Sequence, residues 1–439
     1  MSKARRRELA LIIVTLAMAL LSRLMREPCL APGVTLPVVT GTGCYTDLAA
    51  MWDGRGLSEH LIPYLQPFPD PVTGVLTTVE YPVLSGLVLW LLSLPADSLA
   101  GFVSIVTAFM GLCAALIAVI LHRSVGTLAW VWALAPALIF YLGYNVDALP
   151  TLVSVAALSL LIGRDPRSVQ RGRFLGAAAL LAVGGGLKLY PLLFLIPLCL
   201  WLGFGVSGPG QAPLRTRLRR AGVAALVGAG GFLAINLPFA LLNWDGWLTP
   251  FRYQAARSID ATTMSVWFYV GAAFPGLQGG ALMLLATVAT AVGLACVALA
   301  GWWVARGAGS YPLLGTSVAL LGAYLVLNKV FSPQHIIWML PLILLLGLPV
   351  VWSLFYVLLD PLTYWGWYLS LFAGSSHEDV VQDFWAGIKV AGILVRFAYV
   401  VAIVVVSLSE PASNPPPQID HRRGEPQPQG SGSDQAVVW

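Results

Sequence analysis

The stretch MSKARRRELALIIVTLAMALLSRL, residues 1–24, decides the class of this protein. Basic residues crowd its first seven positions, and an apolar run follows them directly. The pattern has the form of a signal peptide, but no small-residue cleavage site follows it and no lipobox precedes Cys29. We therefore predict an uncleaved membrane span at 8–24 that starts in the cytoplasm, because basic flanks favour that side.

The rest of the chain repeats this apolar character. Of its 439 residues, 58% are hydrophobic and only 10% are charged, whereas an average soluble domain carries about a quarter charged residues. Long apolar runs dominate and period-2 alternation is missing, so we predict an all-α polytopic membrane protein and exclude a β-barrel. The further predicted spans are 99–121, 127–143, 148–163, 174–187, 190–203, 221–242, 281–304, 311–327, 334–350, 352–372 and 388–408.

The segment EYPVLSGLVLWLLSLPADS, residues 80–98, holds too few apolar residues for a full span. We interpret it as a re-entrant or interfacial piece, which puts both termini inside. The net charge of +5 is then a topology signal and gives no support for nucleic-acid binding. The basic loops that fall on the cytoplasmic side are 122–124, 163–173 and 215–220.

The first outer loop, about residues 25–98, contains Cys29 and Cys44, which can form a disulfide outside the membrane. Nothing in their spacing requires one. The cytoplasmic tail, residues 409–439, is rich in Pro, Gln, Gly and Ser and is predicted to be disordered.

Carboxylates are concentrated in this first outer loop. It opens with GCYTDLAAMWDGRGL, residues 43–57, which holds Tyr45, Asp47, Trp52 and Asp53. A carboxylate just beyond a span can act as a general base on a hydroxyl. By position alone, solvation or helix capping is the simpler explanation.

A lysine lies between apolar stretches in VGGGLKLYPLLFLIP, residues 183–197. Lys188 must either snorkel or bind an anion there. The three glycines before it permit a close backbone approach, which favours an anion site. Tyr190 follows on the same outer turn.

Two later segments add outer cations. FRYQAARSIDATTMSVWFYVG, residues 251–271, contains two arginines, and arginine binds phosphate in a bidentate manner. The alternative is an interfacial amphipathic stretch. In VLNKVFSPQHIIWMLPLILLL, residues 326–346, a histidine begins a span, where helix N-termini favour anions. A lone histidine at a span end is more often a satisfied polar residue. The candidate residues of these segments are Arg252, Gln254, Arg257, Ser265, Lys329, Gln334 and His335.

Several site classes lack a signal. No His or Cys spacing fits a metal site, and neither a P-loop nor a G-x-G-x-x-G motif is found. We therefore expect no metal and no cofactor.

In their order and topological side, five motifs resemble the C-type (GT-C) polytopic glycosyltransferases. The resemblance is to glycosyltransferase family 87, the polyprenol-phosphate-mannose-dependent alpha-mannosyltransferases, and it covers residues 8–408. The motifs are YTDLAAMW, EYPVL, KLYPLLFLIPL, RYQAARSIDATTMSVWFYVG and NKVFSPQHIIWMLPL. The resemblance implies a GT-C-like catalytic domain of about twelve spans, followed by the tail.

The resemblance also implies a mechanism in the plasma membrane, with the active site on the extracytoplasmic side. A polyprenyl-phosphate sugar, first of all mannose, enters from the lipid. Asp47 deprotonates a hydroxyl of a glycolipid or glycan acceptor, and polyprenyl phosphate leaves with inversion. Cations must stabilise that phosphate, and the matching positions are Lys188, Arg257 and His335, with Lys329 and Arg252 beside them. The other residues expected to contact substrate are Tyr45, Trp52, Asp53, Glu80, Tyr190, Gln254, Ser265 and Gln334.

One departure and three alternatives remain. Many C-type enzymes carry an adjacent acidic pair, but Leu48 follows Asp47 here, which argues for a metal-independent base and leaves Asp53 or Glu80 as substitutes. The donor sugar can be arabinose or another polyprenyl-linked sugar. A transporter or flippase of lipid-linked glycans is supported by Asp360 and Arg396 inside apolar runs, although no internal repeat is visible. A structural scaffold is the third alternative.

Overall fold

The computed structural model describes residues 3–70, 74–205, 212–376 and 379–409, and their regular structure is almost entirely helical. Five helical segments of this part are long and apolar enough to cross a membrane. They are Lys3–Cys29, Leu99–Ala133, Leu214–Leu242, Gly280–Ala308 and Asp379–Ser409. Several shorter apolar helices accompany them. The prediction of an all-α chain is confirmed, and these helices suit a membrane protein by their length and composition.

The elements, in chain order, have these bounds. The α-helices are α1 Lys3–Arg26, α2 Leu36–Thr42, α3 Asp47–Gly54, α4 Val83–Ser93, α5 Leu99–Val125, α6 Ala129–Ala133, α7 Pro136–Tyr141, α8 Ala148–Ser159, α9 Arg171–Leu187, α10 Leu195–Phe204, α11 Leu214–Leu242, α12 Trp244–Ala256, α13 Val266–Ala273, α14 Gly280–Ala308, α15 Leu313–Leu327, α16 Ile336–Leu346, α17 Val350–Ser376 and α18 Asp379–Ser409. Short 3-10 helices are η1 Glu27–Cys29, η2 Gly126–Leu128, η3 Tyr190–Phe194, η4 Ala261–Thr263 and η5 Pro333–His335, and the strands are β1 Phe68–Pro69 and β2 Leu76–Thr77.

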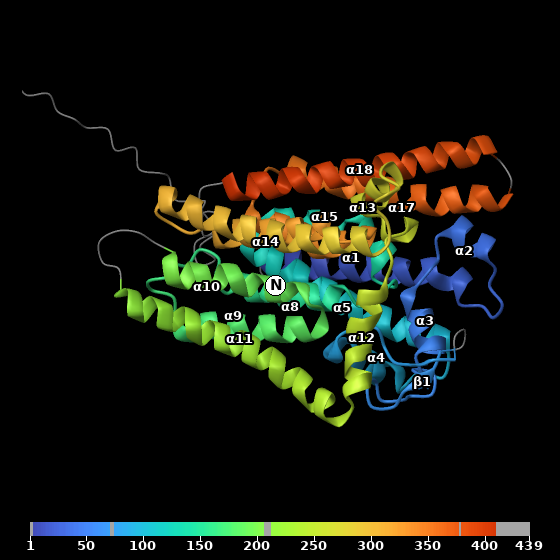
Figure 1. The fold of residues 1–439 in the computed structure, drawn as a ribbon, viewed down its shortest axis with the longest axis horizontal. Coiled ribbons are helices and arrows are strands. Elements are labelled where there is room, and N and C mark those ends of the chain that lie inside the picture. The colour runs from blue at the N-terminus through green and yellow to red at the C-terminus, as the bar shows by residue number, and fades with distance from the viewer. Residues whose placement is uncertain (1–2, 71–73, 206–211, 377–378, 410–439) are drawn as a thin grey trace, which may run out of the picture.

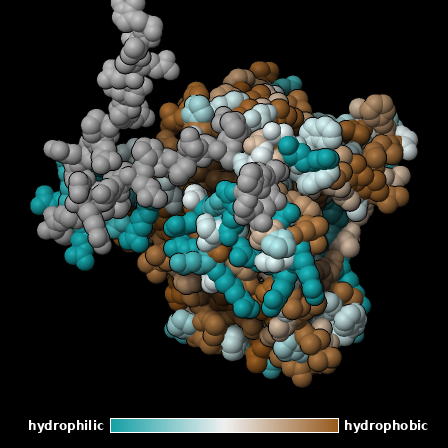
Figure 2. All heavy atoms as spheres, turned by 90° about the vertical axis from the view of Figure 1, so that its left-hand side faces the viewer, coloured by the Kyte–Doolittle hydropathy of each residue, from teal (hydrophilic) through white to brown (hydrophobic). Residues whose placement is uncertain are grey.

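The long helices run side by side along the longest axis of the molecule (Figure 1). The end of α18 and the start of α11 lie at the left-hand end, and Figure 2, which faces that end, shows hydrophilic side chains gathered there. The small elements α2, α3 and β1 lie at the right-hand end, and α12 runs across the bundle between α11 and α13. The first loop therefore lies at the same end of the assembly as the end of α17 and the start of α18.

The first loop is a compact structure of its own. Thr46 caps α3, because its hydroxyl accepts a hydrogen bond from the Leu48 N–H at 3.2 Å and its backbone is extended. Strands β1 and β2 pair antiparallel. A disulfide joins Cys29 to Cys44, so the structure decides a pairing that the spacing had left open.

The structure divides one predicted membrane segment and agrees with the interpretation of another. The range 127–143 is not one continuous helix: it is divided into α6 and α7, because Pro136 begins a new helix and cannot continue the preceding one. Within 80–98, α4 has only 11 residues. It is therefore roughly 16 Å long, about half the apolar thickness of a bilayer. Of the predicted tail, only Ser409 belongs to the described residues, as the last residue of α18.

Candidate functional site

A cavity of about 1160 Å³ lies at the end of the assembly that holds the first loop. It is lined by α2, α3, α12, α17, the turn after α9 and the segment 324–338, which are widely separated in the chain. Its size suits a substrate rather than a single water molecule. The predicted site residues that line it are Tyr45, Asp47, Glu80, Lys188, Tyr190, Gln254, Arg257, Lys329, Gln334 and His335.

Two predicted residues on α3 do not line the cavity. A helix advances 3.6 residues per turn, so Asp47 and Met51 face the cavity while the next positions turn away. Trp52 is buried and stacks on Phe102, with ring centroids 5.1 Å apart. Asp53 is exposed to solvent. The expectation that Trp52 and Asp53 contact substrate is therefore not supported by their positions.

Ser265 and Arg252 also lie outside the cavity lining. Ser265 is fully buried just before α13, where its hydroxyl is 3.2 Å from the Thr263 hydroxyl. Arg252 points outward from α12 and pairs with Asp245 at 2.9 Å, with both side chains largely exposed. The charge of Arg252 is therefore balanced by Asp245 at the surface. Arg252 lies on a different face of α12 from Tyr253 and Gln254, which line the cavity.

Asp47 is held in a fixed position at the start of α3. Its N–H donates to the Tyr144 carbonyl at 3.0 Å, and the Thr46 hydroxyl donates to the Gly143 carbonyl at 2.8 Å. The Tyr81 hydroxyl donates to Asp47 Oδ2 at 3.3 Å. The carboxylate therefore faces the cavity from a rigid turn.

Burial raises the pKa of Asp47 to about 6, against the opposing effects of the Lys188 charge and a hydrogen bond from Tyr45. The nearby Asp147 raises it further. A carboxylate with this pKa is largely ionised at neutral pH, yet it holds a proton more strongly than an exposed aspartate. This balance suits a general base.

Lys188 does not point freely into the cavity. Its ammonium forms an ion pair with Asp147, and it lies over the Tyr81 ring at 5.3 Å and the Trp338 ring at 5.0 Å. The sequence predicted that Lys188 snorkels or binds an anion, and in the structure the anion is Asp147. Sequence reasoning did not select Asp147 as a site residue. Its only signal was its place between two predicted spans.

The glycines before Lys188 serve packing. A Cβ on Gly184 would lie 2.7 Å from the Pro191 side chain, and one on Gly185 would lie 2.5 Å from Leu192. On Gly186 it would meet Leu84 at 2.9 Å. These glycines allow η3 and α4 to pack closely on α9, so the close approach that they permit is to side chains of the protein itself.

Aromatic side chains build the wall around His335. Tyr190 stacks on Trp338 with centroids 4.3 Å apart, and His335 lies 4.3 Å from Trp338 on its other side. His335 is buried at the start of α16 and lines the cavity. Its Nδ1 atom has no hydrogen-bond partner within the described part of the chain.

Arg257 and Lys329 form the neighbouring part of the wall. The Lys329 ammonium donates to the Ala255 carbonyl at 3.2 Å and to the Arg257 carbonyl at 2.9 Å. Burial and the Arg257 charge lower the pKa of Lys329. Arg257 has no carboxylate within ion-pair distance among the residues that the structure describes. Its guanidinium is thus available to an anion.

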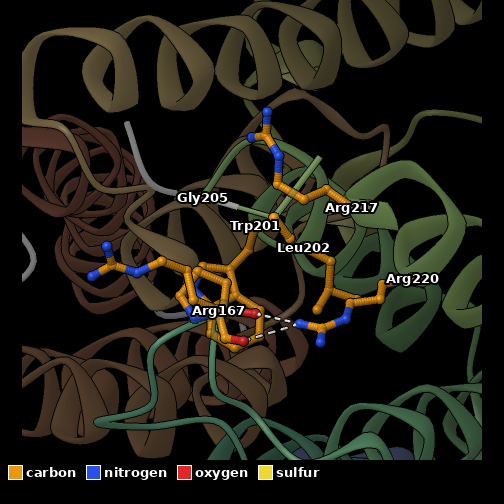
Figure 3. Close-up of a pocket in the computed structure, with 8 residues that line it drawn as sticks. Arg167, Trp201, Leu202, Gly205, Arg217 and Arg220 are labelled. Carbon is orange, nitrogen blue, oxygen red and sulfur yellow. Dashed lines mark hydrogen bonds between the residues drawn. The ribbon is translucent and has the colours of Figure 1, made fainter. Parts of the chain in front are cut away.

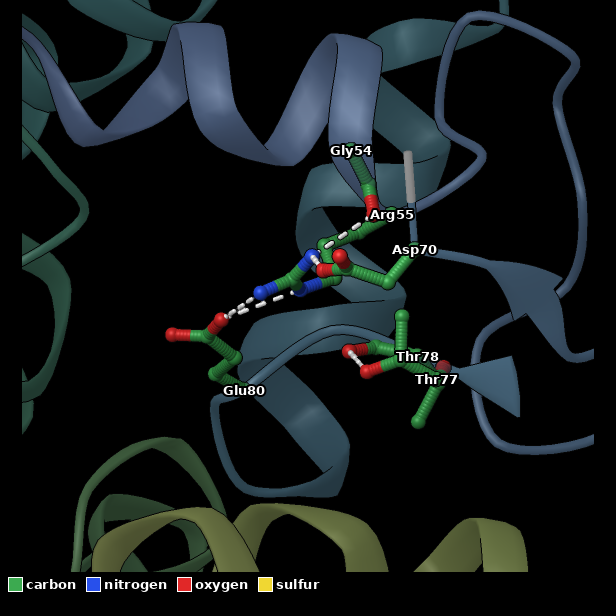
Figure 4. Close-up of polar contacts among 6 residues, drawn as sticks. All are labelled: Gly54, Arg55, Asp70, Thr77, Thr78 and Glu80. Carbon is green, nitrogen blue, oxygen red and sulfur yellow. Dashed lines mark hydrogen bonds and ion pairs between the residues drawn. The ribbon is translucent and has the colours of Figure 1, made fainter. Parts of the chain in front are cut away.

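Glu80 is held by an arginine that sequence reasoning missed (Figure 4). Arg55 Nε donates to Glu80 Oε1 at 3.0 Å, and Arg55 Nη1 donates to Asp70 Oδ2 at 2.9 Å and to the Gly54 carbonyl at 2.8 Å. Hydrogen bonds and ion pairs with the two carboxylates raise the pKa of Arg55, although burial opposes this. Because Glu80 is neutralised in this way, it is a weaker candidate base than Asp47.

The charged residues inside the apolar runs lie outside the cavity lining. Arg396 on α18 donates to the Phe331 carbonyl and lies 4.1 Å from the centroid of its ring. Asp360 on α17 accepts a hydrogen bond from the Tyr141 hydroxyl at 3.0 Å. Both are about 1% exposed, and Arg396 supports the segment that carries Lys329 and His335.

The described residues offer no group suited to a metal ion. In the described ranges, no group of three or more His, Cys, Asp or Glu side chains is arranged to hold a metal ion.

A second pocket, at the start of α11, has room for about 10 Å³ (Figure 3). There Arg220 donates to the Pro166 and Arg167 carbonyls at 3.1 and 3.2 Å. It has room for no more than one water molecule.

The chain matches no protein-family model, and no curated protein matches it.

Proposed function

We propose that the protein is an inverting, GT-C-like glycosyltransferase of the plasma membrane. It moves a sugar, first of all mannose, from a polyprenyl-phosphate donor to a glycolipid or glycan acceptor on the outer face. The observation that carries the proposal is the position of Asp47: a carboxylate with a pKa of about 6 faces a cavity of about 1160 Å³ that Arg257 and His335 also line.

The proposed reaction uses all three of these side chains. Asp47 takes the proton of the acceptor hydroxyl while the hydroxyl oxygen bonds to the anomeric carbon. The bond from that carbon to the phosphate oxygen breaks, and the polyprenyl phosphate departs with the electron pair. Arg257 stabilises the departing charge by a bidentate contact, and His335 supplies a ring nitrogen. Configuration inverts because the attack comes from the face opposite to the phosphate.

The arrangement of the helices supports a membrane location. We propose about twelve spans, with both termini inside and the cavity at the outer end. The arginine-rich loops at the start of α9 and α11 then lie in the cytoplasm, as the positive-inside rule requires. In this orientation a lipid-linked donor reaches the cavity from the outer leaflet.

The alternative of a transporter is weaker for a physical reason. Its main support was Asp360 and Arg396, and both are buried in contacts with neighbouring helices rather than placed along a path through the protein. A largely ionised carboxylate in the same cavity as an arginine that has no carboxylate partner among the described residues suits transfer chemistry better than passage of an intact glycan.

The test is a transfer assay with purified full-length protein in nanodiscs. It uses radiolabelled polyprenyl-phosphate-mannose and a membrane lipid extract, with polyprenyl-phospho-arabinose as a second donor. The variants are Asp47→Asn and, as a matched control on the same helix, Asp53→Asn. Labelled product from wild type and Asp53→Asn but not from Asp47→Asn supports the proposal.

Three other outcomes would contradict parts of it. Equal product from Asp47→Asn and wild type removes Asp47 as the base. Transfer from polyprenyl-phospho-arabinose alone means that the donor sugar is arabinose and not mannose. No product from either donor, together with movement of a lipid-linked glycan across proteoliposomes, makes the protein a transporter.

A further inference from the structure

Asp47 and Asp147 are held by one backbone unit. The turn 143–147 accepts two hydrogen bonds from the start of α3. The Thr46 hydroxyl donates to the Gly143 carbonyl, and the Asp47 N–H donates to the Tyr144 carbonyl. Within the same turn, the Asp147 N–H donates to Asn145 Oδ1 at 3.0 Å. These bonds fix the backbones of Asp47 and Asp147 relative to each other.

Lys188 is the cation that these two carboxylates share. Its ammonium pairs with Asp147, and its stem is confined between the rings of Tyr81 and Trp338. The Tyr81 hydroxyl in turn donates to Asp47. The Lys188 side chain is 13% exposed and that of Asp147 is 1% exposed, so solvent screens their charges weakly. Asp147 Oδ2 has no hydrogen-bond partner in the described ranges.

We propose that Lys188 and Asp147 form a fixed charge pair that controls the protonation and position of Asp47. Asp147 is then a positioning residue, and Lys188 is its counter-ion and not a ligand of the donor phosphate. The catalytic meaning of the pair rests on the function proposed above, but its electrostatic effect on Asp47 does not.

The other titratable groups near Asp47 are phenols, one paired carboxylate and Arg26, whose buried guanidinium donates to the Tyr45 carbonyl at 2.6 Å. The phenols are Tyr45, Tyr81, Tyr144 and Tyr368. Tyrosines stay neutral in the range where Asp47 titrates, because their ordinary pKa is about 10. Glu80 is matched by Arg55. Lys188 and Asp147 are therefore the charges whose removal changes the field at Asp47 most.

The sign of each effect follows from charge. Lys188→Met removes a cation that favours the ionised form, so the pKa of Asp47 rises, by about one unit or more. Asp147→Asn removes an anion that opposes it, so the pKa of Asp47 falls. The double variant removes both charges, and the pKa of Asp47 returns toward the wild-type value.

The experiment titrates Asp47 directly in the full chain in nanodiscs. The infrared absorption of protonated carboxyl groups is followed between about pH 4 and about pH 8, and the component that is lost in Asp47→Asn belongs to Asp47. Opposite shifts in the two single variants and compensation in the double variant support the charge pair. Asp245→Asn, which breaks the exposed pair with Arg252, is the matched control and leaves the titration unchanged.

A titration that is unchanged in both Lys188→Met and Asp147→Asn overturns the proposal. If Lys188→Met fails to fold, Asp147→Asn still decides the question by its downward shift, with Lys188→Arg as a variant that keeps the charge. A rise in donor KM for Lys188→Met without a shift of the acid limb of kcat/KM makes Lys188 a phosphate ligand and contradicts the proposal. Because the titration needs no turnover, shifted titrations without any transfer leave the pair standing and reject only the proposed enzyme.

Discussion

The two ends of the helical assembly are both rich in charge, but they use it differently. Around the start of α11, Arg217 and Arg220 donate to backbone carbonyls beside a pocket of about 10 Å³. At the other end, Asp47, Lys188 and Arg257 border a cavity of about 1160 Å³. Charge alone therefore does not identify a site; the enclosed volume beside it does.

The physical reason lies in solvation. Exposed arginines remain hydrated, cost little and fix the orientation in the membrane. Charges that are partly removed from water need a partner, since an unmatched one costs several kcal/mol. Arg55 and Lys188 have such partners, whereas Arg257 has no carboxylate partner within the described ranges. The following predictions test this contrast.

The largest effect is expected at Asp47. Asp47→Asn keeps the size of the side chain but cannot accept the proton, so kcat falls by about 10²- to 10⁴-fold. Single-turnover measurements with the labelled donor check this. Asp53→Asn stays within about twofold of wild type, because its exposed side chain lies off the cavity. Equal losses in both variants would mean that the loop, and not Asp47, is what matters.

The disulfide comes next. The double variant Cys29→Ser/Cys44→Ser opens a loop whose ends are 15 residues apart, and the free energy of opening this loop falls by about 3 kcal/mol. Hydrogen exchange of the amides at 30–43 measures it, with Cys113→Ser as the control. Because α2 lines the cavity, donor KM rises as well. Unchanged hydrogen exchange would show that the packing of α2 on α17 keeps this loop closed without the disulfide.

The same substitution at the two ends compares them directly. Arg257→Gln raises donor KM about tenfold or more, because a charged hydrogen bond to phosphate contributes roughly 1.5–3 kcal/mol. Arg220→Gln leaves KM unchanged. Initial rates across donor concentrations measure both. A similar KM change in both variants would remove the distinction between the two ends.

The smallest effect concerns stability. The pKa of Asp47 is about 6 in the folded protein, above the ordinary value of 3.8. The folded protein therefore binds the Asp47 proton more strongly than the unfolded chain does. The stability that this proton contributes is fully present below the ordinary pKa and is lost as pH rises through about 6, so the ionised carboxylate weakens the fold at neutral pH. Asp47→Asn therefore raises Tm by a few degrees at neutral pH and leaves it unchanged near pH 4. A pH-independent difference in thermal melting would contradict this.

Much of the site was predictable because its signals are local. Asp47, Arg257 and His335 were selected from outer segments between apolar runs, and the structure brings them around one cavity. Trp52 and Asp53 were selected by the same reasoning but lie outside the cavity lining. They are on the same helix as Asp47, and only the rotation of α3 decides which of its residues face the cavity. Arg55 was missed because its partners Asp70 and Glu80 come from elsewhere in the loop.

The sequence by itself determined the helical class, the apolar segments and the charged loops between them, because hydropathy and charge act on each segment independently. Only the tertiary structure decided which charges meet. Lys188 pairs with Asp147, 41 positions away, and Arg396 supports Phe331, 65 positions away. Such pairings depend on how helices pack, and the strength of an ion pair depends on the distance and burial that packing sets.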